Sequence, residues 1–183
     1  QVINQINWNV DKYLLGRLSG TTAVAIYGVG NTMRSLYTHF STAISSVFIP
    51  RVNKMVAESH DNRKLTDLMA RVGRLQFIIL SLILSGYAYF GQSFVQLWAG
   101  DDYAQSFWVA LIIMIPGTVP LIQNIGIDIQ IAKNQHRVRS VVYAIIAVGN
   151  GIVSIPLIKA LGPVGASIGT AIALFLGNVL FMN

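Results

Sequence analysis

Polar side chains recur along one face of the segment 23–56. They are Tyr27, Asn31, Arg34, Thr38, Ser41 and Ser45. Their spacings of three and four residues place them on one side of an α-helix. Arg34 lies about 18 Å along the helix axis from the turn at Thr22, and its planar guanidinium suits a phosphate group. The stripe predicts a hydrated cavity in which Arg34 attracts an anionic substrate; the alternative is a structural ion pair between Arg34 and Asp11 or another acid.

Two adjacent charged residues, Asp11 and Lys12, precede this stripe. Neighbouring residues on a helix point in different directions, so the two side chains serve different purposes. Lys12 is a second, weaker candidate for binding an anion in the cavity. Asp11 is either the structural counter-charge of Lys12 or Arg34, or a carboxylate that binds a coupling cation, and the sequence leaves both open.

Two prolines and two polar residues share the segment 105–132. They are Pro116, Pro120, Asn124 and Asp128. A proline removes a backbone hydrogen bond and bends a helix, so a bent helix with polar residues on its inner side predicts a gate. The alternative is a fixed kink that serves packing. A fainter polar stripe, which includes Asn150, follows in the segment 139–159.

No group of residues has the spacing of a catalytic or metal-binding site. His39 and His136 are far apart in the sequence, and no cysteine is present to supply a thiolate. Gly28 and Gly30 lack the strand–turn–helix setting of a dinucleotide site. We therefore expect no enzymatic activity, no cofactor and no bound metal.

The composition is that of a chain that uses lipid as its solvent. Of the 183 residues, 54% are hydrophobic and 11% are charged, whereas a soluble domain has about 25% charged residues. So few charges exclude an ordinary soluble surface, and they also exclude a disordered chain. A helical span takes about 20 residues, so the length predicts about six spans.

Turn signals and apolar runs divide the sequence into expected spans. These are 1–18, 23–56, 65–97, 105–132, 139–159 and 164–183. No convincing strand alternation is present, so the expected fold is an all-α bundle of about six transmembrane helices over residues 1–183. Small residues repeat every four positions in the last span, from Gly165 to Gly177, which predicts a face that packs closely against another helix.

Basic residues gather in two of the expected connections. Nine of the 13 Lys and Arg residues lie in these connections or in the adjoining ends of the spans, namely Arg51, Lys54, Arg63, Lys64, Arg71, Arg74, Lys133, Arg137 and Arg139. The turns at 19–22, 99–103 and 160–163 contain none. This asymmetry places the basic connections in the cytoplasm. The net charge of +6 is then explained by topology and by contact with anionic membrane lipids, and we expect no nucleic-acid partner.

Several stretches together resemble a known family. They are residues 11–16, 25–27, 45–50, 97–100, 149–150, 156–158 and 162–170. In order and spacing they resemble the polysaccharide biosynthesis (O-antigen) flippases of the MATE-like (MOP) exporter superfamily. In that family two six-helix bundles face each other, so the resemblance implies that this chain is one bundle, the C-terminal half of a longer transporter.

The resemblance implies movement of an undecaprenyl-diphosphate-linked oligosaccharide across the bacterial cytoplasmic (inner) membrane by alternating access. Basic residues of the cavity would meet the diphosphate, a role that passes here to Arg34 and, more weakly, to Lys12. Further candidate contacts to the diphosphate or glycan are Asn31, Tyr27, Thr38 and Asn150. Candidates for coupling to H⁺ or Na⁺, or for gating, are Asp11, Pro116, Pro120 and Asn124.

Three other functions stay open. A cation-coupled multidrug exporter of the same superfamily would favour an acidic cavity, and Asp11 is compatible with it. A membrane glycan ligase or polymerase would need a large outer loop, which the sequence lacks. A scaffold bound to other glycan assembly proteins would tolerate apolar substitution of Arg34.

Overall fold

The computed structural model describes residues 11–58, 62–132 and 137–177. These residues are helical apart from short turns, and none of them forms a strand. Three helical stretches among them are long and apolar enough to cross a membrane, namely Arg63–Ala99, Asp101–Ile122 and Val153–Phe175. The expectation of an all-α membrane protein is therefore confirmed, and the number of about six spans stays a prediction.

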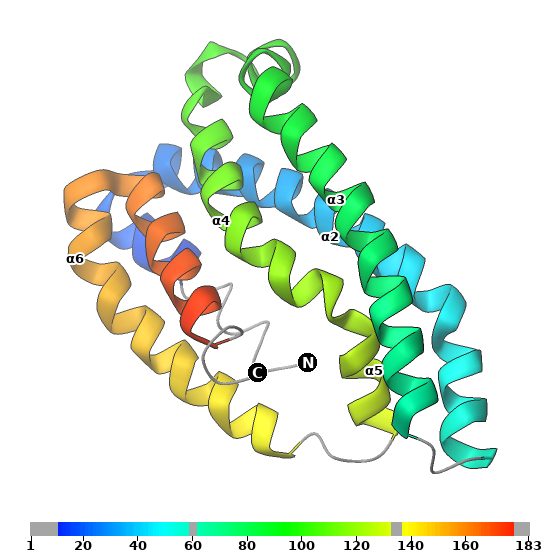
Figure 1. Cartoon of the computed structure of the whole chain (residues 1–183). Helices are drawn as coiled ribbons and strands as arrows, with labels where there is room; N and C mark the ends of the chain where they lie inside the picture. The colour runs from blue at the N-terminus through cyan, green and yellow to red at the C-terminus, as the bar shows by residue number, and fades with distance from the viewer. Residues whose placement is uncertain (1–10, 59–61, 133–136, 178–183) are drawn as a thin grey trace.

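The helices form a bundle around α4. A helix over residues 11–18 leads through Ser19 into the first long helix. The elements that follow are α2 (Gly20–Glu58), α3 (Asn62–Ala99), η1 (Asp101–Tyr103), α4 (Gln105–Ile122), α5 (Asn124–Ala132) and α6 (Arg137–Phe175). Helix α4 lies between α2, α3 and α6 and packs against all three (Figure 1).

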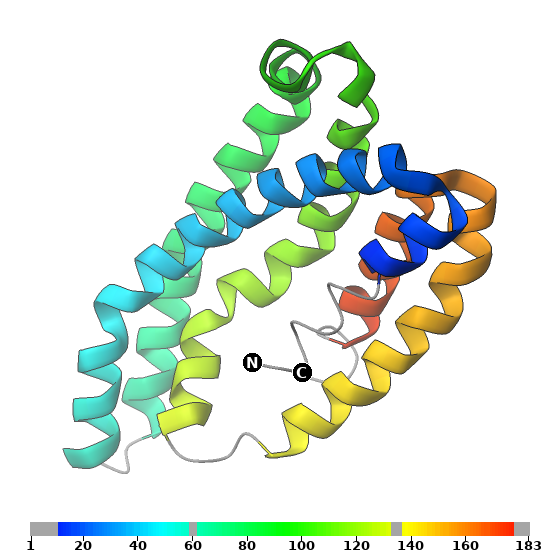
Figure 2. The ribbon, with the colours of Figure 1, turned by 180° about the vertical axis from the view of Figure 1, so that it is seen from behind.

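Helix α2 is longer than a bilayer is thick. Its 39 residues extend over about 58 Å, compared with a hydrocarbon core of about 30 Å. Figure 2 shows α2 running from the turn within α6 to the beginning of α3. Pro50 lies inside α2, directly before Arg51, the first of the basic residues that the charge asymmetry assigns to the cytoplasmic side. The polar stripe and the basic end of α2 thus belong to one continuous helix.

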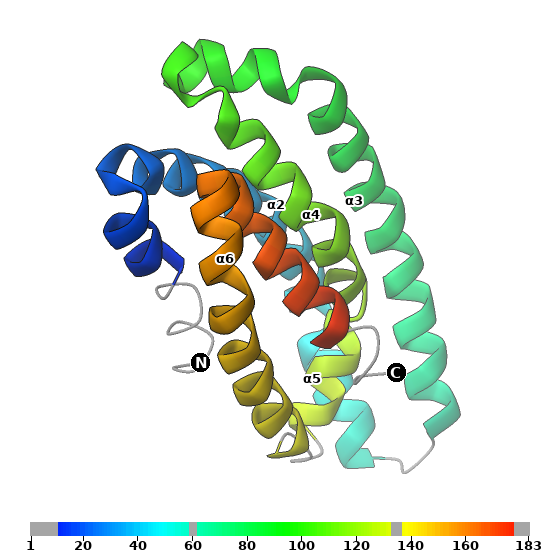
Figure 3. The same cartoon turned by 90° about the vertical axis from the view of Figure 1, so that its left-hand side faces the viewer.

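Glycines with positive φ angles stand at all three of the expected outer turns. They are Gly20, Gly100 and Gly162, with φ of 85°, 101° and 58°. A Cβ atom would meet nothing within 4 Å at these positions, so backbone conformation is what favours glycine there. At Gly162 the chain turns back inside α6, and Figure 3 shows the two arms of α6 side by side.

The small residues of the last expected span pack closely, as their spacing predicts. They face the preceding arm of α6: a Cβ on Gly165 would clash with the backbone of Leu157, and one on Gly169 with the side chain of Ser154. The two arms therefore approach each other at distances that only glycine permits at these positions.

The structure divides the expected segment 105–132 into two helices. Pro116 and Pro120 both lie within α4, and the break comes at Gln123, with φ −97° and ψ 5°. Pro120 has no N–H to donate, which weakens the helix just before this break. The carbonyl of Leu121, at the end of α4, accepts a hydrogen bond of 2.8 Å from the Ser41 hydroxyl of α2. A contact from a neighbouring helix thus stabilises the end of α4.

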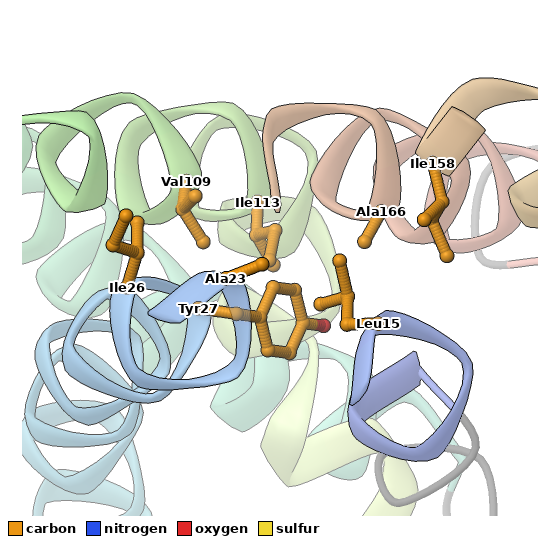
Figure 4. Close-up of a cluster of buried hydrophobic side chains, with 8 residues drawn as sticks. All are labelled: Leu15, Ala23, Ile26, Tyr27, Val109, Ile113, Ile158 and Ala166. Carbon is orange, nitrogen blue, oxygen red and sulfur yellow. The ribbon is translucent and has the colours of Figure 1, made fainter. Parts of the chain in front are cut away.

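Buried apolar clusters hold the helices together, while the outer surface stays apolar. The first cluster, shown in Figure 4, joins the 11–18 helix to α2, α4 and α6 through Leu15, Ala23, Ile26, Tyr27, Val109, Ile113, Ile158 and Ala166. On α3, by contrast, Leu82, Tyr89 and Leu97 are 72%, 82% and 90% exposed. A soluble protein rarely shows so large an apolar surface, whereas a bilayer solvates it.

Candidate functional site

The polar stripe of α2 faces the interior of the bundle, as its spacing predicts. Three of its side chains are buried, namely Tyr27, Ser41 and Ser45. Three are half-buried, namely Asn31, Arg34 and Thr38. The apolar side chains on the outer side of α2 are exposed, and Phe40 and Val47 are 53% and 74% accessible. The stripe therefore supplies polar groups to the protein interior.

A cavity of about 110 Å³ lies beside the middle of this stripe. It is lined from α2, α4 and α6 by Arg34, Tyr37, Thr38, Ile113, Met114, Gly117, Pro120, Leu121 and Leu174. This volume holds several water molecules. Arg34 is the charged group of the lining, so the cavity is apolar with one strong cationic donor on its wall.

Neighbours on α2 hold the Arg34 side chain. Its Nε donates a hydrogen bond of 2.9 Å to Oδ1 of Asn31, one turn earlier. One turn later, the Thr38 hydroxyl donates a hydrogen bond of 3.1 Å to the backbone carbonyl of Arg34. Because Asn31 takes up the Nε–H, its side chain fixes the plane of the guanidinium. An oriented guanidinium can bind two oxygens of a phosphate at once.

Another wall of this cavity is the proline-containing part of α4. Pro120 and Gly117 line it directly, whereas Pro116 lies in α4 outside the lining. Tyr37 joins the two walls, since its hydroxyl lies 2.8 Å from the Thr118 hydroxyl and donates 3.3 Å to the carbonyl of Leu80. A change in the bend of α4 would therefore change the shape of the cavity around Arg34.

A second polar centre forms around Asp11. The residue is 1% exposed, and its Oδ2 accepts hydrogen bonds from the Thr170 hydroxyl at 2.7 Å and from the Tyr27 hydroxyl at 3.2 Å. Asn150 and Ser154 of α6 also lie close enough to interact with the carboxyl, and Ser154 donates 3.1 Å to Asn150 Oδ1. Figure 4 shows the Tyr27 hydroxyl pointing toward the 11–18 helix.

The second carboxyl oxygen of Asp11, Oδ1, differs from Oδ2 in its surroundings. Asp11 Oδ1 is buried and accepts no hydrogen bond from the residues that the structure describes. A buried carboxylate oxygen without a donor is costly. A proton on this oxygen would remove the buried charge, and the side chains of Thr170, Ser154 and Asn150 lie around the carboxyl. The hydrogen bonds to Asp11 Oδ2 come from Tyr27 and Thr170.

A third group of polar side chains ties α2 to α3 and α5. Gln76 is fully buried, and its Nε2 donates to the carbonyl and hydroxyl of Ser41 and to the hydroxyl of Ser45. Asn124, at the start of α5, donates 2.9 Å to the same Ser41 hydroxyl. Asn124 thus contacts the stripe beside the helix break.

The structure therefore distributes the predicted site residues over separate places. Arg34, Thr38 and Pro120 line the cavity, and Asn31 bonds to Arg34 beside it. Asp11, Tyr27 and Asn150 meet at the carboxyl centre. Lys12 is half-buried and belongs to neither lining, and the side chain of Asp128 lies outside the described residues.

Sequence reasoning missed two polar residues of the interior, Thr170 and Gln76. Thr170 donates to Asp11 from a part of the chain distant from it, and Ser154 of the fainter stripe lies at the same carboxyl. Gln76 had a visible signal, since it is an amide between Leu75 and Phe77 at the start of a long apolar run. Polar side chains in such runs point toward protein or water.

Among the described residues, no three His, Cys, Asp or Glu side chains gather as a set of metal ligands. In comparisons with known proteins, no curated protein and no solved structure matches the chain significantly. A family model described as polysaccharide biosynthesis protein matches residues 1–108. This match includes the 11–18 helix, α2, α3 and the beginning of α4, and hence Asp11 and the whole α2 stripe. The chain belongs to the polysaccharide biosynthesis protein family.

Proposed function

We propose that this membrane protein carries an undecaprenyl-diphosphate-linked oligosaccharide across the bacterial cytoplasmic membrane by alternating access, without catalysing a covalent reaction. Membership of the polysaccharide biosynthesis family supports a role in polysaccharide assembly or transport. A lipid-linked glycan combines an apolar tail, a diphosphate and sugars. Its carrier needs a cationic group on a polar path inside an apolar bundle, which is the arrangement around Arg34.

The position of Arg34 is the observation that carries this proposal. An arginine in the middle of a membrane helix costs about 2.5–3.5 kcal/mol. Here it lies on the wall of a cavity, and Asn31 holds its Nε at 2.9 Å. A diphosphate bound to the guanidinium would offset the cost of burying the charge, and Thr38, which lines the same cavity, would contact the ligand or its first sugar.

The broken helix pair α4 and α5 is the proposed moving part. Pro120 and Gly117 line the same cavity as Arg34, so a change of the bend widens or narrows the site without moving the arginine. Asn124 is bound to Ser41 in the state described here. In the other state of the cycle this contact would be exchanged for another.

Asp11 is the proposed coupling site. Its carboxyl joins the 11–18 helix to α2 and to both arms of α6. Binding of H⁺ or Na⁺ at Oδ1 would neutralise the buried charge and change how tightly these helices hold together. Such a change biases a two-state element, which is the requirement for coupling.

A drug exporter coupled to a cation is the second candidate, and the buried acid at Asp11 is the observation that favours it. The cationic cavity favours an anionic cargo instead. A deletion strain separates the two: loss of surface glycan with unchanged drug resistance supports the glycan carrier, whereas drug sensitivity with intact glycan supports the exporter.

The experiment is the substitution of Arg34 in the full-length protein, expressed at its normal level. We expect Arg34→Ala to leave lipid-linked oligosaccharide inside the cell and to deplete surface glycan, and Arg34→Lys to retain part of the export. Arg17→Ala is the matched control, because it removes one exposed positive charge at the end of the 11–18 helix. Export by Arg34→Ala equal to that of the control would remove Arg34 from the mechanism.

A further inference from the structure

A second pocket, with a volume of about 180 Å³, lies between the end of α2 and the beginning of α3. It is lined by Arg51, Met55, Lys64, Asp67, Leu68 and Arg71. It shares no residue with the cavity at Arg34 or with the centre at Asp11. The transport cycle proposed above makes no use of it.

Both helices present this pocket through their regular spacing. On α3, Asp67 and Leu68 both lie three or four residues from Lys64 and from Arg71, which places the four on one face, and Arg51 and Met55 are one turn apart on α2. The polar groups are exposed, whereas Leu68 is 7% exposed and Met55 is half-buried. The pocket therefore has a charged rim above an apolar floor.

Most of the polar groups of the rim are cations. Arg51, Lys64 and Arg71 line the pocket together with one carboxylate, Asp67. Arg51 comes from α2 and Arg71 from α3, and guanidinium groups suit the oxygens of a phosphate.

The pocket also lies at the depth of lipid headgroups. Arg71 precedes Phe77, the first residue of the apolar run of α3, by about 9 Å along the helix axis. The charge asymmetry of the chain places this end in the cytoplasm. Basic pockets between membrane helices on the cytoplasmic side suit anionic headgroups, and the floor of Met55 and Leu68 suits the glycerol and upper acyl carbons.

We propose that the pocket between α2 and α3 binds the phosphate of an anionic phospholipid of the cytoplasmic leaflet. Arg51, Lys64 and Arg71 hold the phosphate oxygens. Asp67 accepts a hydrogen bond from a headgroup hydroxyl and lowers the net attraction. The bound lipid ties the cytoplasmic ends of α2 and α3 together, independently of the cargo.

The test measures binding to the purified full-length protein in a neutral detergent. The probes are short-chain phosphatidylglycerol, short-chain phosphatidylcholine and inorganic phosphate, and the variants are Arg51→Gln, Arg71→Gln and Asp67→Asn. Arg74→Gln is the matched control, because Arg74 is an exposed cation of α3 that does not line the pocket. Gel filtration and the Tm without lipid verify that each variant is folded.

We expect phosphatidylglycerol to bind more tightly than the other two probes. Each arginine substitution should weaken its binding about five-fold, since a basic residue near the membrane surface contributes about 1 kcal/mol. Asp67→Asn should tighten it, and Arg74→Gln should have little effect. If Arg74→Gln weakened binding equally, or if Asp67→Asn bound the lipid more weakly, the assignment of this pocket as the lipid-binding site would be overturned. Inorganic phosphate binding as tightly as the lipid would overturn the assignment to phospholipid.

Discussion

The hydrogen bonds at Asp11 allow a quantitative prediction. Thr170→Val removes the 2.7 Å donor to Oδ2 while keeping the shape of the side chain. Tyr27→Phe removes the 3.2 Å donor to the same oxygen. Both changes leave the carboxyl buried with one fewer donor, so both should lower the free energy of unfolding, and the shorter bond should matter more.

The magnitude follows from burial. A hydrogen bond to a charged group contributes about 1.5–3 kcal/mol, whereas bonds between membrane helices average about 0.6 kcal/mol and reach about 1.7. Because Asp11 is 1% exposed, we expect the upper end of the membrane range, about 1.7 kcal/mol for Thr170→Val. In an Asp11→Asn background the same change should cost about 0.6 kcal/mol, since its acceptor is then neutral.

The assay is reversible denaturation of the full-length protein in mixed micelles. Thr170→Val, Asp11→Asn and the variant that carries both changes form the double-mutant cycle. Thr32→Val is the control, because its hydroxyl is exposed and bonds to the Gly28 carbonyl within its own helix. Equal losses from Thr170→Val in both backgrounds would refute the reasoning, because the bond to a charged Asp11 would then contribute nothing specific.

Three further changes probe the packing and the bend. Gly30→Ala places a Cβ 2.7 Å from Val109, so it should destabilise by about 1–3 kcal/mol, seen as a lower Tm. Gln76→Leu removes the amide that bonds to Ser41 and Ser45, and denaturation should show a loss of about 1 kcal/mol. Pro120→Ala restores a backbone donor at the bend, so it should raise the Tm while lowering glycan export; unchanged export would show that the bend serves packing alone.

The helical architecture is predictable because it follows from local rules. The turns at Gly100 and Gly162 lie where the sequence places them, since each needs a φ that glycine favours. The inward direction of the α2 stripe follows from its spacing and from the cost of exposing polar groups to lipid. The resemblance to the polysaccharide biosynthesis family is confirmed by the family match.

The division of the stripe into separate sites could not be predicted in the same way. Tyr27 and Arg34 share one helix face, but Tyr27 bonds to Asp11 and Arg34 lines a cavity. The turn of α6 at Gly162 brings Thr170 to Asp11 and Tyr27 and not to Arg34. This arrangement depends on tertiary packing, which the local spacing does not reveal. The break at Gln123 likewise depends on a contact from another helix, since Ser41 of α2 takes the carbonyl of Leu121.

The central claim is that Arg34 binds the diphosphate of a lipid-linked oligosaccharide during transport. Its most direct test is reconstitution of the full-length protein in liposomes that contain fluorescent undecaprenyl-diphosphate-linked oligosaccharide, with movement measured by quenching from one side. We predict a rate about 10- to 100-fold lower for Arg34→Ala, since a hydrogen bond to a charged group contributes about 1.5–3 kcal/mol, with partial activity for Arg34→Lys. An unchanged rate for folded Arg34→Ala would contradict the account.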